Sequence, residues 1–352
     1  MVKAAIDTFS EKKHLICFPH TVKLIMQSII HDIPAGKDLI AKVKRIVTYF
    51  RQSSIAAYKQ DCPTRWNSTF EMIERFLVLM NAVTCSLLSL EGAPPMLSSA
   101  ELRLLKEIMD LFKPAKDVTK SISGERYVTG SQLLPLIAWF RAEVAALKPV
   151  CDIGRIVKDA LEAGIQQRLK VYETKKYQSL IGVAGLLDPR FKRKYFPSNL
   201  YDAEVLNLVN VFIKDSEHPN PQVKKAKNPQ EDFPQGDALW KHHNQRISQH
   251  QKLAAETPGL GTLDINLKQY TSNPHKPPGT DIIKFWLAQK ENTPALAKIA
   301  LKYCCVLGSS VPCERLFSAA ARLTEDRSRL TAEHIWRSLF MKSLGFPDWH
   351  LS

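Results

Sequence analysis

Two side chains near the start of the chain, Cys17 and His20, have the types and the spacing of a zinc-ligand pair. A zinc site takes four ligands, and no second Cys/His pair at comparable spacing follows them. Cys17 and His20 therefore supply only half a site. A buried thiol beside a hydrogen-bonded imidazole explains the pair equally well. The sequence predicts no bound metal at these residues.

Arg65 and Trp66 have side chains suited to nucleic acid. An indole stacks on an unpaired base, and a guanidinium group holds a phosphate. However, Trp66, Phe70 and Ile73 recur at helical spacing, which is typical of a buried helix face. The residues alone leave both interpretations open.

The charge of the chain favours an acidic partner. The formal net charge is +14 and the pI is about 9.4. Lys and Arg side chains gain affinity for phosphate backbones by releasing condensed counterions, so DNA is the first candidate. The densest basic clusters are Lys192, Arg193 and Lys194, and residues 224–227 (KKAK). Each cluster could bind DNA, direct nuclear import or form a solvated surface.

Glu314 lies in residues 311–318 (VPCERLFS), at a predicted helix start in this basic chain. A carboxylate at a helix start complements the helix macrodipole. It can also pair with a neighbouring cation such as Arg315 or Arg322. From the residues alone, this structural role is the simplest interpretation of Glu314.

Residues 280–344, with Glu314 and the run RSRLTAEHIW ending at Trp336, resemble the C-terminal dimerisation region of hAT-type transposases and of the BED zinc-finger proteins derived from them. Three further stretches carry the same resemblance in the order that the family has them. They are MVKAA at 1–5 with CFPHTVKL at 17–24, DCPTRWNSTF at 61–70, and GLLDPRFK at 185–192. Together these stretches extend the resemblance over the whole chain.

The resemblance implies that Glu314 corresponds to the last metal-binding acid of an RNase H-like nuclease. It also implies that Cys17 and His20 close the first segment of that nuclease, near the DNA. In the family the first two catalytic aspartates lie upstream of the position at which this sequence begins. Two-metal phosphoryl transfer needs several carboxylates, so we expect a catalytically incomplete chain. On this hypothesis Mg²⁺ would bind only if an upstream segment completed the site, and no other cofactor is expected.

Apolar residues at helical intervals extend along most of the chain. The predicted fold class is mainly α with a partial α/β remnant, a truncated RNase H-like core interrupted by an all-helical insertion domain. We expect the end of the first RNase H-like segment at 1–60, the helical insertion at 61–214, and the dimerisation region at 280–346. Residues 215–279 are rich in Pro and polar residues, and we expect a largely disordered linker with one helix at 238–255.

The C-terminal region has more large apolar side chains than short helices can bury among themselves. A partner surface would cover the excess, and a core shared with the insertion domain is the rival explanation. The side chains that we expect at a subunit interface are Phe285, Trp286, Leu316, Phe317, Trp336 and Phe340.

Two classes of function fit the sequence. The first is a non-enzymatic nuclear protein that forms a homodimer or larger homo-oligomer and contacts DNA through basic patches. The second is a fragment of a DNA transposase whose first two aspartates lie upstream. No apolar run approaches the roughly 18 residues of a membrane span, so no membrane partner is expected. No small-molecule substrate is expected either.

Overall fold

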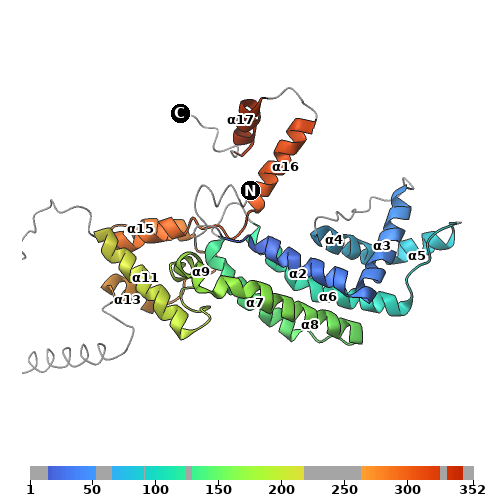
Figure 1. Cartoon of the computed structure of the whole chain (residues 1–352), viewed down its shortest axis with the longest axis horizontal. Helices are drawn as coiled ribbons and strands as arrows, with labels where there is room; N and C mark the ends of the chain where they lie inside the picture. Colours follow the sequence, from blue (N-terminus) through green and yellow to red (C-terminus); the bar gives the residue numbers. More distant parts are fainter. Residues whose placement is uncertain are drawn as a thin grey trace, which may run out of the picture. The chain divides into compact units, whose positions relative to one another are not determined.

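The structure is a computed structural model that describes residues 15–52, 66–90, 92–123, 129–217, 263–325 and 331–343. Every regular element in these ranges is a helix, as Figure 1 shows. The expectation of a mainly α fold is therefore confirmed. The described residues hold no strand, so the α/β remnant of an RNase H-like core is not confirmed. None of the described helices has the length and apolar character needed to cross a membrane.

The helices form two compact units, and the chain passes from one unit to the other several times. The first unit consists of Met1–Thr129, Leu136–Lys170 and Leu307–Ser352. The second unit consists of Gly130–Pro135 and Val171–Val306. Both units are thus built from segments that are far apart in the sequence.

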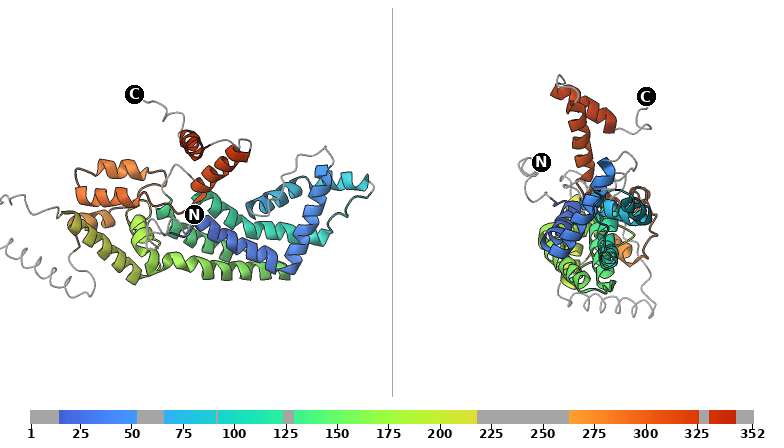
Figure 2. Two further views of the ribbon diagram at one scale, coloured as in Figure 1. Left: turned by 45° about the horizontal axis from the view of Figure 1, so that its top comes forward. Right: turned by 90° about the vertical axis from the view of Figure 1, so that its right-hand side faces the viewer.

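In the first unit, α2 (Phe18–Asp32) packs against α6 (Ser99–Ile122) and α8 (Asp152–Leu169), and Figure 2 shows these helices side by side. The fully buried face of α2 includes Val22, Ile25 and Met26. Helix α8 approaches α2 closely because Gly164 has no side chain: a Cβ there would lie 2.9 Å from Cγ2 of Ile25.

Helix α6 begins at a capping motif that is visible in the sequence, a Ser followed three residues later by a Glu. Ser98 caps α6 through a capping box, in which its Oγ accepts from the Glu101 amide and the Glu101 carboxylate accepts from the Ser98 amide. Lys42 of α3 (Pro34–Gln52) donates to the same carboxylate. The Lys42 and Ser98 hydrogen bonds lower the pKa of Glu101 to about 2.

The helical spacing of Trp66, Phe70 and Ile73 falls on α4 (Trp66–Val78), and a separate helix, α5 (Met80–Leu88), follows it. Leu79 between them leaves the helical conformation, with φ −94° and ψ 5°. Val83 and Leu87 of α5 are buried, so the apolar pattern continues across the break. Periodicity alone does not reveal such a one-residue interruption.

The second unit is formed by short helices and by α11 (Asn199–Glu217), which packs against α15 (Pro294–Tyr303) and α10 (Val183–Leu186). A π-helical turn over Gln178–Gly182 precedes α10. The other helices of this unit that matter for the site are α13 (Ile265–Ser272) and α14 (Ile282–Ala288).

Helix α13 is an ordered element inside residues 215–279, where we expected a largely disordered linker. Its N-cap Asp264 accepts hydrogen bonds from the amides of Asn266 and Leu267, and the Asp264 amide donates to Oδ1 of Asn210. Leu267 and Tyr270 are buried. Two buried anchors and a cap thus order this stretch despite the nearby prolines. The expected helix at 238–255 and the basic cluster at 224–227 lie outside the described residues.

Candidate functional site

The Cys17 motif and the segment that carries Glu314 meet in the first unit. The Ser310 amide donates to Sγ of Cys17 at 3.3 Å, and the Phe18 amide donates to the Gly308 carbonyl at 3.1 Å. The Gly308 amide in turn donates to Oγ1 of Thr129. Two stretches from opposite ends of the sequence, both singled out by the resemblance, therefore lie side by side at the starts of α2 and α16 (Val311–Glu325).

Glu314 is exposed on the first turn of α16, where its Oε1 accepts from Oγ of Ser310 at 2.7 Å. This is the geometry of a carboxylate that stabilises a helix start. Across the described ranges, no group of three or more His, Cys, Asp or Glu side chains could hold a metal ion. His20 is exposed, and Cys17 is half-buried.

Helices α16 and α17 (Ala332–Ser343) pack against each other and leave an apolar surface in solvent. Phe317 is 54% exposed, Trp336 is 64% exposed and Phe340 is 51% exposed. The rings of Trp336 and Phe340, one helical turn apart, stack with centroids 5.7 Å apart. We call Phe317, Trp336 and Phe340 the aromatic face. The nearby Leu316 is half-buried.

The two aromatic residues of α14 differ from this face. Trp286 is only 1% exposed, and its Nε1 donates to the Leu187 carbonyl at 2.7 Å. Its ring lies 5.0 Å from that of Tyr270. The expectation that Trp286 lies at a subunit interface is therefore corrected: its indole belongs to the core of the second unit. Phe285 is half-buried and packs edge-on against Trp286.

The basic cluster at 192–194 is mostly engaged inside the second unit. Lys192 is 4% exposed, and its Nζ donates to the carbonyls of Tyr270 and Asn273 at the end of α13. Burial lowers the pKa of Lys192, and the nearby Lys276 lowers it further. Arg193 pairs with Asp202. The Lys192 ammonium group, which we expected at a DNA contact, is therefore buried and engaged by two carbonyls of its own unit. Lys194 is exposed.

Trp66 is also corrected as a candidate for base stacking. Its side chain is 4% exposed at the start of α4, in the core of the first unit with Phe70 and Ile73. An enclosed indole has no free face for a base, so the core interpretation holds for Trp66. Arg65 lies outside the described residues.

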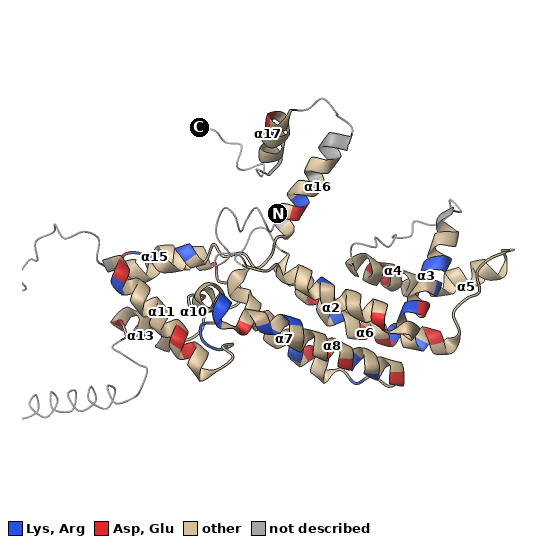
Figure 3. Ribbon diagram, viewed as in Figure 1, with Lys and Arg blue, Asp and Glu red and all other residues tan. Residues whose placement is uncertain are grey.

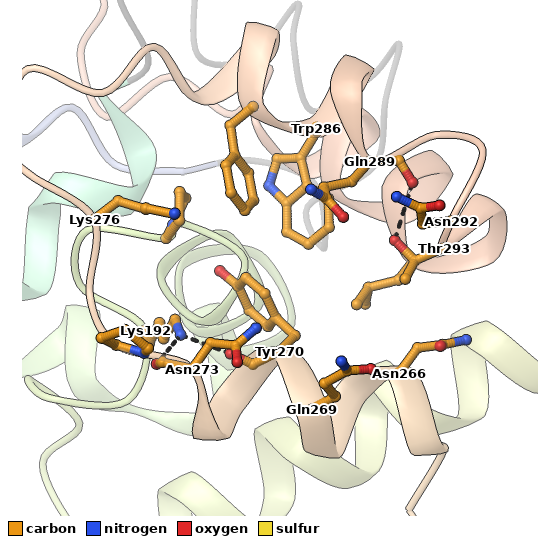
Figure 4. A pocket seen from close by; sticks show the side chains of 14 residues that line it. Lys192, Asn266, Gln269, Tyr270, Asn273, Lys276, Trp286, Gln289, Asn292 and Thr293 are labelled. Carbon is orange, nitrogen blue, oxygen red and sulfur yellow. Dashed lines mark hydrogen bonds between the residues drawn. The ribbon is translucent and has the colours of Figure 1, made fainter.

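A pocket of about 500 Å³ in the second unit was not predicted from the sequence. Figure 4 shows side chains from α13 facing those from α14 and the turn after it. Five carboxamides line it, and we call it the amide pocket: Asn266, Gln269, Asn273, Gln289 and Asn292. The spacing of the three from α13 follows one helix face. This spacing could have indicated the pocket from the sequence, but we expected residues 215–279 to be a largely disordered linker.

Lys and Arg residues are spread over helices of both units rather than collected on one of the described helices, as the colouring of the ribbon in Figure 3 shows. Helices α3, α8 and α15 all carry some of them. Any contact with an anionic partner would therefore draw on several elements.

Comparison with known proteins gives these features a context. Residues 266–343 match the model of the hAT family C-terminal dimerisation region. The chain is 23% identical over 365 residues to the human protein "Zinc finger BED domain-containing protein 4", which covers 95% of this chain and 30% of that protein.

Two maize proteins are also similar. The "Putative AC transposase" is 25% identical over 369 residues, covering 91% of this chain and 42% of the relative. The "Putative AC9 transposase" is 24% identical over 389 residues, covering 91% of this chain and 44% of the relative. The chain thus spans less than half the length of each of these relatives. The aromatic face and the five carboxamides of the amide pocket lie inside residues 266–343, the part of the chain that matches the hAT family C-terminal dimerisation region, and over most of its length the chain is similar to these two putative transposases and to the zinc-finger BED protein.

Proposed function

We propose that this chain self-associates through the aromatic face of α16 and α17, as part of a non-enzymatic nuclear protein that contacts DNA. The observation that carries the proposal is the exposure of Phe317, Trp336 and Phe340, each more than half in solvent on two helices of the dimerisation region. Residues 280–346 remain our proposal for the associating segment.

The chemistry of the aromatic face supports association over a role in the chain's own core. Aromatic side chains are the commonest anchors of protein interfaces, and a few of them dominate the binding energy. A stacked Trp336 and Phe340 pair is already arranged at one helical spacing, so little side-chain freedom is lost when a partner covers it. A second copy of the same face would bury all three rings.

The test is a comparison of Trp336→Ala with Leu88→Ala by sedimentation velocity at micromolar concentration. Leu88 is the matched control because it is 85% exposed on α5, outside the dimerisation region. We expect the wild-type chain and Leu88→Ala to associate. Trp336→Ala should weaken association by about 2 kcal/mol, roughly thirtyfold in the dissociation constant, with helix content unchanged.

Two results would contradict the proposal. One is a wild-type chain that sediments as a monomer at micromolar concentration. The other is a Trp336→Ala variant that unfolds without any change in assembly, since a core tryptophan costs about 3–5 kcal/mol of folding free energy when it is truncated.

The DNA contact rests on charge. The chain has a formal net charge of +14, and Lys194 is an exposed member of its basic cluster after Lys192 and Arg193 are engaged. Cations on several helices would bind phosphates without reading bases. We therefore propose weak binding to duplex DNA without sequence preference.

The second candidate is that the chain is a part of a DNA transposase. One observation favours it: the two maize relatives are putative transposases that match 91% of this chain. The test is incubation of the purified chain with plasmid DNA and Mg²⁺ or Mn²⁺, beside Glu314→Gln. We expect no nicking, because two-metal cleavage needs several carboxylates in one cluster. Nicking that Glu314→Gln abolishes would favour the transposase function instead.

A further inference from the structure

The amide pocket has two polar walls and an aromatic side. Asn266, Gln269 and Asn273 come from α13 and the residue that follows it, and Gln289 and Asn292 come from the end of α14 and its turn. Figure 4 shows the two sets across the hollow from each other. Phe285 and the buried Trp286 form part of the lining between the walls.

The carboxamides of the pocket are free to bind a ligand. Within the part of the chain that the structure describes, none of the five side-chain amides hydrogen-bonds to another protein group. The pocket backbone, by contrast, is tied down: Asn273 and Tyr270 supply carbonyls to Lys192, and Gln289 supplies its carbonyl to Thr293. A fixed frame with unpaired donors and acceptors is the arrangement of a binding site.

The charge of the pocket selects against a cationic ligand. Its lining contains Lys192 and Lys276 and no Asp or Glu. Lys192 is satisfied by two carbonyls, whereas Lys276 is exposed, with its Nζ 6.0 Å from the Phe285 ring centroid. Residues 266–306 hold six lysines and two acids, so the surroundings are also basic. A ligand with a negative group at one end fits this field.

A nucleotide has the matching chemistry. Carboxamides of Asn and Gln pair with the edges of bases, best with adenine, where a donor and an acceptor lie side by side. An aromatic ring can stack on a base, and an ammonium group can hold the adjoining phosphate. A volume of about 500 Å³ lies within the range of ligand pockets and leaves room for one nucleotide.

We propose that the amide pocket binds an unpaired nucleotide of single-stranded DNA, with its base between the two amide walls and its phosphate near Lys276. Duplex DNA would not enter, because its bases are stacked and paired inside the helix and must be unstacked before one can enter a pocket. This proposal extends the proposed DNA contact, but it assigns base recognition to a site distinct from the exposed basic side chains.

The test compares binding of the full-length chain to a labelled 20-nucleotide single strand and to the same strand in duplex form, by fluorescence anisotropy. The variant is Gln269→Ala with Gln289→Ala, which removes one free amide from each wall. The control is Asn207→Ala, an exposed amide on α11 of the same unit and outside the pocket. Circular dichroism checks that all three proteins are folded.

We expect the double variant to lose at least about fivefold in affinity for the single strand, with duplex binding unchanged and the control equal to wild type. The loss of affinity should be largest for an adenine-rich single strand. The proposal would be overturned if the double variant lost the same affinity for both forms of DNA. It would also be overturned if the double variant bound the single strand as tightly as the wild type. Absence of duplex binding alone would contradict the proposed duplex contact and not this pocket.

Discussion

At the scale of single residues, the most constrained group is Asp188 in the stretch GLLDPRFK. Its carboxylate is fully buried and accepts from Oγ of Ser131 at 2.7 Å and from Nη2 of Arg190 at 2.8 Å. The Arg190 amide and Nε also donate to it. A buried charge with this many partners stabilises the fold only while every partner remains.

Asp188→Asn should therefore destabilise the chain by about 3–5 kcal/mol, since it leaves the Arg190 guanidinium partly buried without its counter-charge. Urea unfolding followed by circular dichroism measures the loss. Asp152→Asn is the matched control, because Asp152 also pairs with an arginine but is 90% exposed, and its midpoint should barely change. Equal midpoints for the two variants would show that the buried pair contributes nothing special.

The same stretch shows what the sequence could and could not predict for single residues. The resemblance placed Asp188 and Lys192 in one block, but the structure gives them different partners: Asp188 binds Ser131 and Arg190, whereas Lys192 binds the carbonyls of Tyr270 and Asn273 at the end of α13. The basic cluster suggested DNA contacts instead for Lys192. Composition gives the charge of a lysine but not the direction in which its side chain points. The side chain of Lys192 is buried, and its backbone has a φ of 48°.

At the scale of elements, the mainly helical content followed from apolar periodicity along the chain, and residues of capping type, Ser98 and Asp281, stand at the starts of α6 and α14. Helix α13 was missed because it is short, polar on one side and surrounded by prolines. Its order depends on partners far away in the sequence, namely Asn210 and Leu186, which accepts from the Tyr270 hydroxyl. Such contacts leave no local signal.

Two glycines in helices should respond in opposite directions to the same substitution. Gly164→Ala would place a Cβ 2.9 Å from Ile25, and overpacking costs about 1–3 kcal/mol, more than the roughly 1 kcal/mol that alanine adds in helix propensity. Gly36→Ala meets nothing closer than 3.9 Å and should gain up to about 1 kcal/mol. Thermal melts decide: a Gly164→Ala protein that melts above wild type would show that α2 and α8 can move apart.

At the scale of the whole molecule, the two units interleave along the chain, with residues 307–352 returning to the first unit after the second is complete. A reading of the sequence in consecutive blocks cannot show this, because compactness depends on contacts such as Phe18 with Gly308. The block boundaries at 60, 214 and 279 remain predictions. All three residues of the aromatic face were among the side chains expected at a subunit interface, and Trp336 and Phe340 lie four residues apart, one helical turn along α17, whereas Phe317 belongs to α16.

The net charge of the whole chain leads to the last prediction. If DNA is held by cations on several helices, the logarithm of the duplex binding constant should fall linearly with the logarithm of salt concentration, with a slope of about −0.9 for each neutralised phosphate. Fluorescence anisotropy at salt concentrations from about 50 to about 200 mM gives the slope. Lys194→Ala should make it shallower by about 0.9 if that exposed ammonium group contacts a phosphate. A tight, sequence-selective affinity that salt does not change would contradict binding through charge, because only contacts to base edges survive when the phosphates are screened.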